Sequence, residues 1–228
     1  MADPQPITLY SHTRAPNPWK VALILEELGV PYQTKYLEFP ETKQEPYLSL
    51  NPNGKLPAIE DPNHHVTLFE SGAIIEYLVD LYDSKSILTP SSLQDKYRAR
   101  SWLHLQMSAQ GPSCGYKLRM GQVYDAKELV AANDYLSKDI KRLMGVLDTH
   151  LRQSGGPYLL GPQVSYADLC YVPLYSMLPV FLPDYDVETQ SDFPHFAAWW
   201  TKVVERPAVT KVMETRAALA KSLTGDDE

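Results

Sequence analysis

Glu70 and Ser71 are the residues whose types and spacing most directly suggest ligand chemistry. They follow a β-prone run that ends at Phe69, and the pattern after them predicts a helix. A helix N-terminus with free N–H groups and a hydroxyl suits a carboxylate, whereas the adjoining Glu70 carboxylate suits an ammonium. Ser71 at the expected N-cap is also explained as an ordinary helix cap. If both groups bind a ligand, they would hold the zwitterionic α-carbon of an amino acid.

A proline at the start of another β-prone run suggests how a peptide could be held. In Leu56-Pro57-Ala58 the proline stands at the first strand position, where it is tolerated for purely structural reasons. If the bond before Pro57 were cis, the N–H and C=O of Leu56 would point outward and could pair with a peptide backbone, as an added strand does. The sequence is compatible with both interpretations of Pro57, an ordinary strand start and a binding site for a short peptide.

The turn Ala15-Pro16-Asn17-Pro18, between the first expected strand and its helix, could hold a thiol. In a thioredoxin-like fold this turn would carry a redox C-x-x-C pair, and neither position is cysteine here. The positive end of the helix and the Asn17 amide could both stabilise a thiolate and so lower the pKa of a bound thiol. We therefore expect the sulfur to come from the ligand.

The elements that position these residues form a βαβ pattern in the first third of the chain. β-prone and helical runs alternate there, which favours a small sheet covered by helices. Asn17 is expected to cap the first helix, with Pro18 at its first position and Gly29 at its left-handed end. The expected strands are 7–10, 32–39, 56–60 and 66–69, of which the last two form a hairpin, and the expected helices are 18–28 and 71–82.

From position 93 onward the pattern is almost entirely helical, which is typical of a separate helical bundle. A long helix is expected up to Leu151, and Ser165 with Asp168 resembles a capping box ahead of a helix over 169–178. A loop is expected after Gln110. The last expected helix, 193–205, is stopped by Pro207, and 225–228 reads as a frayed acidic tail.

The sequence thus predicts two domains of different class. The first is an α/β thioredoxin-like N-terminal domain over 1–85, and the second is an all-α helical-bundle C-terminal domain over 93–228. The polar, proline-containing stretch between them suits a linker.

The composition argues against several other functions. A net charge of −7 opposes nucleic-acid binding, which draws on clustered Lys and Arg. No apolar run is long enough to cross a membrane, and the first residues lack a signal-peptide pattern, so we expect a cytoplasmic protein. Cys114 and Cys170 form no C-x-x-C pair and the histidines lack metal-site spacing, so neither a disulfide framework nor a metal is expected. Residues 111–115 match G-x-S-x-G, but a helical run precedes them where a hydrolase needs a strand.

Three segments resemble the glutathione transferases. They are Ser11-His12-Thr13-Arg14-Ala15-Pro16-Asn17, Asn51-Pro52-Asn53-Gly54-Lys55-Leu56-Pro57-Ala58 and Phe69-Glu70-Ser71-Gly72-Ala73-Ile74. The likeness spans essentially the whole chain, and 165–168 resembles the family's folding motif in the helical domain. In this order and spacing the motifs are specific. The most similar class is the fungal and bacterial one named after the yeast nitrogen-catabolite regulator.

The resemblance implies a binding site for glutathione. Glu70 and Ser71 would meet its γ-glutamyl end, and Leu56 would pair with the backbone of its cysteinyl part. Lys55 and Lys43 would meet the glycyl carboxylate.

The resemblance also implies that Asn17 stands beside the sulfur. Other classes place a Tyr, Ser or Cys there, and the Ser or Cys position corresponds to Ala15 in this sequence. The alternative candidates for stabilising the sulfur are Tyr10, Ser11 and Arg14.

A homodimer and a small hydrophobic electrophile as second substrate are further implications of the resemblance. The electrophile would lie against the helical domain. Candidate wall residues follow Gln110, although core packing explains aromatic and Met residues equally well. They are Tyr116, Leu118, Met120 and Tyr124.

Three reactions would use the same thiolate, and conjugation is the leading one, with the other two as alternatives. They are conjugation to an electrophilic carbon, cis/trans isomerisation of an activated double bond, and reduction of a disulfide. A scaffold that binds partners without catalysis is the alternative, and intact Glu70, Ser71 and Pro57 count against it. The sequence also leaves open whether the role is detoxification or a step in making a metabolite.

Overall fold

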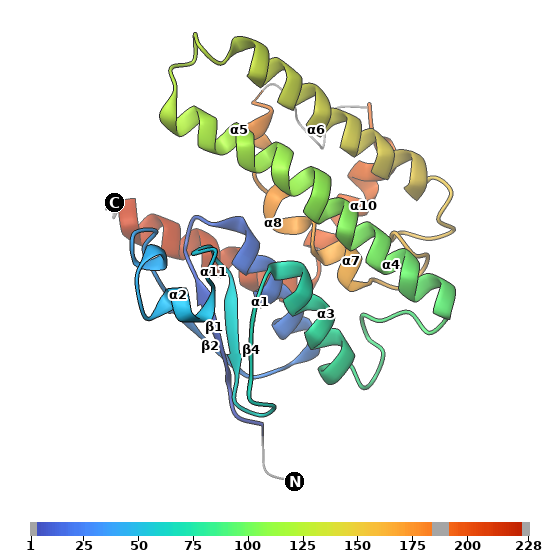
Figure 1. Cartoon of the computed structure of the whole chain (residues 1–228). Helices are drawn as coiled ribbons and strands as arrows, with labels where there is room; N and C mark the ends of the chain where they lie inside the picture. The colour runs from blue at the N-terminus through green and yellow to red at the C-terminus, as the bar shows by residue number, and fades with distance from the viewer. Residues whose placement is uncertain (1–3, 184–191, 225–228) are drawn as a thin grey trace. The chain divides into compact units, whose positions relative to one another are not determined.

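The computed structural model describes residues 4–183 and 192–224, which fall into two compact units. One unit runs to Thr89 and takes up the chain again at Glu205, and the other spans Pro90–Val204 (Figure 1). Within the described ranges, no helix combines the length and apolar character that crossing a bilayer requires.

The first unit is built on a four-stranded sheet of order β2-β1-β3-β4. β1 pairs in parallel with β2, whereas β3 pairs antiparallel with both β1 and β4. The predicted hairpin is confirmed, with Ala58 opposite Phe69 and Asp61 opposite Val66. The strands are β1 (Ile7–Ser11), β2 (Tyr32–Tyr36), β3 (Ala58–Asp61) and β4 (Val66–Phe69), so the second and third are shorter or later than expected.

Helices α1 (Pro16–Leu28) and α3 (Ser71–Tyr82) cover one face of this sheet (Figure 1). The bounds of α3 are those predicted, and Gly29 ends α1 in the left-handed conformation with φ 65°. The prediction that Asn17 is the N-cap of α1 was wrong. Ala15 is the N-cap, because Pro16 already has helical geometry at the first position. The N-cap of α3 is Glu70 rather than Ser71, which is the first helical residue.

The opposite face of the sheet carries the 3-10 turn η1 (Glu41–Lys43) and the short helix α2 (Tyr47–Leu50). Tyr47 packs there with Tyr10 and Ala58 in a small buried cluster. The Tyr47 hydroxyl also donates to the carbonyl oxygen of Lys55 over 2.7 Å. This cluster fixes the loop that leads into β3.

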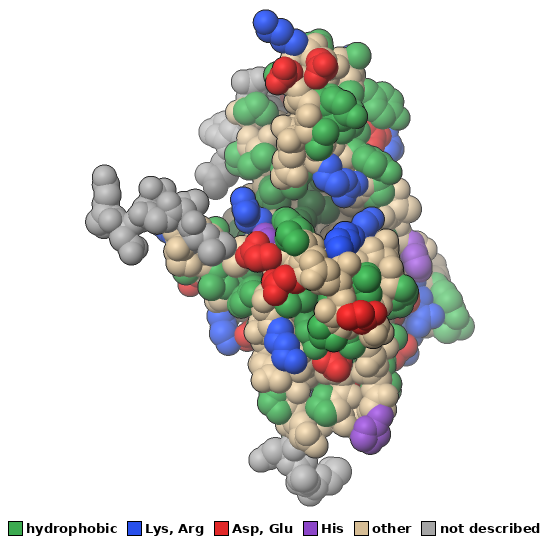
Figure 2. Space-filling model, turned by 60° about the vertical axis from the view of Figure 1, so that its left-hand side comes forward, with side chains coloured by type: hydrophobic (Ala, Val, Ile, Leu, Met, Phe, Trp, Pro, Cys, Tyr) green, Lys and Arg blue, Asp and Glu red, His purple; other side chains and the backbone are tan. Residues whose placement is uncertain are grey.

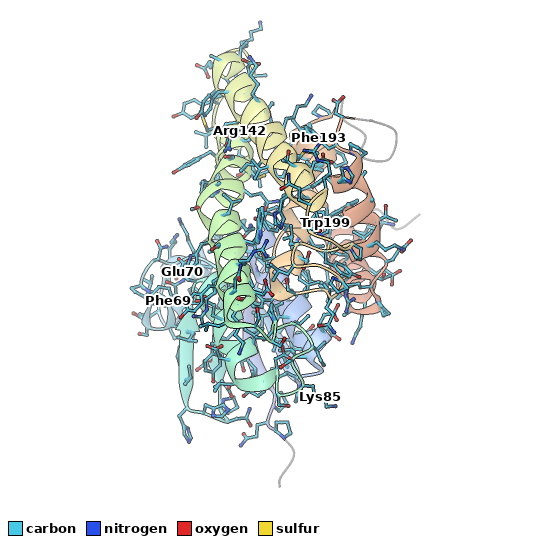
Figure 3. All side chains as sticks on the ribbon, turned by 90° about the vertical axis from the view of Figure 1, so that its right-hand side faces the viewer. Phe69, Glu70, Lys85, Arg142, Phe193 and Trp199 are labelled. Carbon is cyan, nitrogen blue, oxygen red and sulfur yellow. The ribbon has the colours of Figure 1, made fainter. Side chains whose placement is uncertain are left out.

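The named elements of the second unit are all helical among its described residues, and an isolated β-bridge joins Tyr158 and Gly161 between two of them. Its elements are α4 (Leu93–Leu105), the π-helical turn η2 (Gln106–Gln110), α5 (Gly111–Val123), α6 (Val130–Leu151), α7 (Tyr166–Leu169), α8 (Val172–Tyr175), α9 (Leu178–Phe181) and α10 (Pro194–Val204). The fold class predicted for both halves is confirmed. Figure 3 shows Phe193, before α10, and Arg142 on α6.

The prediction of a loop after Gln110 was wrong, because the backbone stays helical from α4 through η2 into α5. Pro112 falls in the first turn of α5, where no N–H is required. Ser113 donates to the Asp139 carboxylate over 2.5 Å from within this helix. The G-x-S-x-G match therefore lacks the strand that a nucleophile elbow needs.

The predicted capping box is confirmed, and its Asp168 has a wider role. This carboxylate is fully buried and accepts hydrogen bonds from the backbone N–H groups of Leu159 and Ser165 and from the Trp199 indole. The helix expected over 169–178 is instead divided into short helices, two of which begin with a proline in the first turn. Each proline removes one backbone hydrogen bond, which explains the interruptions.

Helix α11 (Pro207–Thr224) was not predicted, since Pro207 begins this helix instead of only ending α10. The helix packs against α1, and Arg206 just before it forms an ion pair with Glu27 at 2.6 Å. The described residues 205–224 therefore group with the first unit, in contrast to the single domain over 93–228 that the sequence predicts. The expected acidic tail at 225–228 lies outside the described residues.

Charged side chains of both signs share the molecular surface. On the face shown in Figure 2, Lys and Arg are interspersed with Asp and Glu, and hydrophobic side chains are exposed between them. The face shown has no continuous basic stripe of the kind that binds nucleic acid.

Candidate functional site

The strand register brings the predicted site residues to one end of the sheet. Tyr10 lies opposite Ala58, and Ala58 lies opposite Phe69. The chain leaves β1 toward Asn17, enters β3 from Leu56 and leaves β4 at Glu70 on this same end, because β3 runs antiparallel to both neighbours. Three segments far apart in the sequence therefore meet there.

Asn17 is the principal polar residue at the start of α1. Pro16 and Pro18 have no backbone N–H, so Asn17 is the one residue among 16–18 that offers such a donor. Its side chain is half-buried, and Oδ1 is enclosed without a hydrogen-bond partner among the described residues. This arrangement leaves the amide nitrogen as the atom that can face a ligand. The helix start therefore provides a backbone and a side-chain donor from a single residue.

The three substitutes for Asn17 are poorly placed to activate a thiol. The Tyr10 hydroxyl donates to Glu60 over 2.6 Å, and burial, reinforced by Glu60, raises the pKa of Tyr10 well above its ordinary value. Ser11 is buried within β1, and the Arg14 side chain is exposed. The two cysteines, Cys114 and Cys170, are buried in the helical unit, so the first unit supplies no cysteine thiol of its own.

Glu70 has a backbone conformation that is unusual for a residue with a side chain. Its φ of 70° lies in the left-handed region, which costs a non-glycine residue about 1–3 kcal/mol. Its side chain is exposed, whereas Ser71 is 2% exposed at the first position of α3. Figure 3 shows Glu70 beside Phe69, where the sheet passes into the helix. Strain of this kind is concentrated at ligand-binding positions.

Lys43 and Lys55 flank a tight turn around Gly54. The Lys43 ammonium donates to the carbonyl oxygens of Asn53 and Gly54. The Lys55 side chain is exposed, and its backbone carbonyl accepts hydrogen bonds from Tyr47 and from the Asn51 amide. The turn therefore brings the Lys43 ammonium to the short stretch of backbone that carries Lys55.

Gly54 is required by this turn for two reasons. Its φ is 58°, and a Cβ built on it would lie 2.6 Å from the Thr42 carbonyl oxygen. Thr42 itself is buried and donates to the carbonyl oxygens of Phe39 and Gly54 over 2.8 and 3.0 Å. Thr42 thus serves to close the turn.

Leu56 lies just before β3 and outside its strand pairing. The Leu56–Pro57 peptide bond is cis. The Leu56 side chain packs against the cluster of Tyr10, Tyr47 and Ala58. The backbone position of Leu56 is therefore fixed by the core beneath it.

His12 is a residue that the sequence analysis overlooked. Its ring is buried, stacks on Phe39 at a centroid distance of 4.0 Å, and accepts a hydrogen bond at Nδ1 from the Arg14 backbone N–H. Nε2 lies 3.5 Å from the Glu38 carboxylate. These contacts hold the loop between β1 and α1 in place. No spacing signal identifies His12, because its partners come from a distant loop.

Known proteins match both halves of the chain. The glutathione S-transferase N-terminal domain matches residues 5–80, and the glutathione S-transferase C-terminal domain matches residues 117–216. The glutathione S-transferase-like protein OpS6 of Beauveria bassiana is 65% identical over 96% of this chain and 100% of the relative. Protein URE2 of Saccharomyces bayanus is 28% identical, covering 90% of this chain and 69% of the relative.

Solved structures agree with this assignment. Glutathione transferase URE2P6 from Phanerochaete chrysosporium, crystallised with oxidized glutathione, has a TM-score of 0.84 and 36% identity over 93% of this chain and 96% of that one. Ure2p in complex with glutathione has a TM-score of 0.83 and 29% identity over 93% of this chain and 100% of that one. The chain therefore belongs to the glutathione S-transferase family, in the Ure2-like class that its motifs indicated.

Proposed function

We propose that the protein binds glutathione at the end of the sheet where Asn17, Leu56 and Glu70 meet, and activates its thiol for attack on a small electrophile. The single observation that supports this most strongly is their convergence from three separate segments in a unit without a cysteine. Crystal structures of proteins with a similar fold contain glutathione or oxidized glutathione.

The proposed contacts match the chemistry of the tripeptide. Glu70 pairs with the γ-glutamyl ammonium, and the start of α3 at Ser71 receives the adjacent carboxylate. Leu56 pairs with the cysteinyl backbone as an added strand would. The Lys43 ammonium lies against the carbonyl oxygens of Asn53 and Gly54, and Lys55 follows Gly54 directly, so both lysines attract the glycyl carboxylate.

Asn17 donates to the sulfur and stabilises the thiolate, assisted by the positive end of α1. A thiol with a pKa of about 8.5 is only a few per cent ionised at pH 7. A fall of about two units raises the thiolate fraction tens of times, and larger falls add little. The thiolate then forms a bond to the electrophilic carbon, and the leaving group departs with its electron pair.

Product analysis tests this function. The protein is incubated with glutathione and 1-chloro-2,4-dinitrobenzene, and the products are identified by mass spectrometry. We expect the thioether adduct and chloride, at a rate above that of a Glu70→Gln variant. Calorimetric titration without detectable glutathione binding would instead support a non-catalytic scaffold.

Disulfide reduction is a second candidate, favoured by the relatives crystallised with oxidized glutathione. Here the thiolate attacks one sulfur of a disulfide, the other sulfur leaves as a thiolate, and a mixed disulfide forms. A second glutathione releases the substrate thiol and yields oxidized glutathione. Isomerisation would return glutathione unchanged with a product of the same mass as the substrate, so the three reactions are distinguished by their products.

We also infer a homodimer formed through the helical unit. Aromatic side chains on and beside α4, α5 and α6 are exposed, and the Arg119 guanidinium lies over the Tyr116 ring at 5.1 Å. Tyr and Arg are enriched in protein interfaces. Sedimentation equilibrium should give the mass of two chains, and the mass of one chain would exclude the dimer. The exposed tyrosines are Tyr97, Tyr116, Tyr124 and Tyr135.

A further inference from the structure

The segment that joins β1 to the start of α1 leaves several of its own polar groups unsatisfied. Three of its buried side-chain atoms have no hydrogen-bond partner among the described residues, namely His12 Nε2, Thr13 Oγ1 and Asn17 Oδ1. Buried polar atoms without partners are uncommon, and each lowers stability. The segment therefore depends on a small number of other contacts to keep Asn17 in one position.

Two side chains, Trp19 and His12, make these contacts. The Trp19 indole N–H, from α1, is shared between the backbone carbonyl oxygens of His12 and Thr13 at 3.2 and 3.3 Å. His12 Nδ1 accepts a hydrogen bond from the Arg14 backbone N–H over 3.0 Å. A side-chain acceptor bonded to the N–H two residues later closes a turn in the way that Asn and Asp side chains do. The His12 bond thus fixes the backbone three residues before Asn17.

The loop after β2 orients the His12 ring. The ring is 2% exposed and stacks on Phe39 at a centroid distance of 4.0 Å, with 14° between the two planes. Because Nδ1 accepts the Arg14 hydrogen bond, the proton of the neutral ring is on Nε2. Nε2 lies 3.5 Å from the Glu38 carboxylate, whose side chain is 65% exposed, so this contact contributes little. Stacking therefore holds the ring, and Nδ1 is its contact with the loop.

Phe39 is in turn held by the turn that carries the lysines. Its carbonyl oxygen accepts a hydrogen bond from the Thr42 hydroxyl over 2.8 Å, and the same hydroxyl lies 3.0 Å from the Gly54 carbonyl oxygen. His12 therefore stacks on a residue whose backbone is fixed, and it connects that backbone to the loop before α1.

We propose that His12 is a positioning residue for thiol activation, because its Nδ1 fixes the loop that holds the Asn17 amide toward the sulfur. The inference rests on the proposed function, in which Asn17 donates to the thiolate. A donor that is already in place when charge develops stabilises that charge without having to reorganise. If the loop were released, Asn17 would spend part of its time away from the sulfur, and the thiolate would be less stable.

Two variants of His12 separate its acceptor from its ring. His12→Phe keeps a ring that can stack on Phe39 and loses Nδ1, whereas His12→Asn loses the ring and keeps an acceptor for the Arg14 N–H. In ultraviolet titrations of bound glutathione, His12→Phe should raise the pKa of the thiol by about half a unit to one unit. Its kcat at pH 7 should fall about three- to tenfold, with KM for glutathione within about twofold. His12→Asn should restore most of both values.

A double variant tests whether His12 acts through Asn17. In an Asn17→Ala background, His12→Phe should raise the pKa of the bound thiol no further, because the donor that His12 positions is already gone. A general structural effect of losing His12 would instead add to the effect of Asn17→Ala. The matched control is His64→Phe, since His64 also contacts an aromatic ring, that of Tyr82 at 5.7 Å, but lies in the turn between β3 and β4. This control should keep the wild-type pKa.

Amide hydrogen exchange measured by NMR examines the loop without glutathione. The Arg14 N–H should exchange about tenfold faster in His12→Phe than in the wild type, and at nearly the wild-type rate in His12→Asn and His64→Phe. An unchanged exchange rate in His12→Phe, an unchanged pKa of its bound thiol, or an effect that adds to that of Asn17→Ala would each overturn the role of His12. A wild-type protein that leaves glutathione unbound, or its thiol ionising like the free one, would overturn the proposed function itself.

Discussion

Glu70 combines a strained backbone with the side chain that we expect to bind the γ-glutamyl ammonium. Glycine adopts a φ of 70° without a Cβ penalty, although it also adds entropy to the unfolded chain. Glu70→Gly should therefore raise the free energy of unfolding by about 1 kcal/mol while lowering glutathione affinity about tenfold or more. Chemical denaturation and calorimetric titration measure the two effects.

Glu70→Gln separates charge from strain. The glutamine keeps the same backbone conformation, so stability should stay at the wild-type level while affinity falls. A Glu70→Gly variant that is less stable than the wild type would contradict the strain argument.

Asn17 acts on the sulfur in the proposed site, not on the ends of the tripeptide. Asn17→Ala removes one hydrogen bond to a charged group, so the pKa of the bound thiol should rise by about one unit and kcat/KM at pH 7 should fall about tenfold. KM for glutathione should change little, because Glu70 and Leu56 are untouched. Steady-state kinetics across pH checks this.

Asn17→Ser serves as the rescue variant, since its shorter side chain keeps a donor. Partial recovery of kcat/KM is expected. An unchanged pH profile in Asn17→Ala would remove Asn17 from the mechanism.

At the scale of elements, the turn between η1 and β3 depends on Gly54. In Gly54→Ala the new methyl group would meet the Thr42 carbonyl oxygen at 2.6 Å in addition to the strain of φ 58°, so we expect a loss of about 3 kcal/mol in unfolding free energy. Glutathione affinity should fall as well, because the turn positions Lys43 and Lys55. Denaturant unfolding and calorimetry provide both readouts.

Gly29 is the matched control for that variant. Its φ is 65°, and a Cβ there meets nothing within 4 Å. Gly29→Ala should therefore cost only the backbone term, about 1 kcal/mol, and leave glutathione binding intact. Equal losses in the two variants would show that close packing at Gly54 is unimportant.

Elements with strong local signals could be predicted from the sequence. The bounds of α3, the hairpin of β3 and β4 and the capping box at Ser165 follow from periodicity, turn residues and cap chemistry. Two features could not be predicted: the continuity of α4 through η2 into α5, and the start of α11 at Pro207. Proline and glycine have the same local preferences at a helix start and at a break, so the sequence does not distinguish the two cases.

The candidate site also has features that the sequence indicates and features that only the structure gives. The residue types at Glu70, Ser71 and Asn17 already indicate a zwitterion and a thiol. The positive φ of Glu70 and the stacking of His12 on Phe39 are set by contacts between distant segments, so no local pattern carries them. The chemistry assigned to these side chains stays a prediction from the sequence, whereas the contacts that support them are known only from the structure.

At the scale of the whole molecule, the chain returns to its first unit after the helical one. Arg206 donates through Nε and Nη2 to the Glu27 carboxylate at 2.6 and 2.7 Å, and the Glu27 side chain is 7% exposed. Arg206→Ala would leave that carboxylate buried with a lost bidentate partner, so unfolding free energy should fall by about 2 kcal/mol. Urea denaturation followed by circular dichroism measures it.

Lys211→Ala is the control on the same helix. This lysine is 66% exposed and pairs with Glu26 at 2.7 Å, so its loss should cost less than about 1 kcal/mol. A smaller loss from Arg206→Ala than from Lys211→Ala would contradict the role given to the buried pair.

The most direct test is an ultraviolet pH titration of glutathione bound to the wild-type protein, following thiolate absorbance. The protein is proposed to supply donors and the tripeptide the reactive sulfur, so the bound thiol should ionise about one to two units below the ordinary value near 8.5. No binding at millimolar glutathione, or a bound thiol that ionises like the free one, would contradict the account.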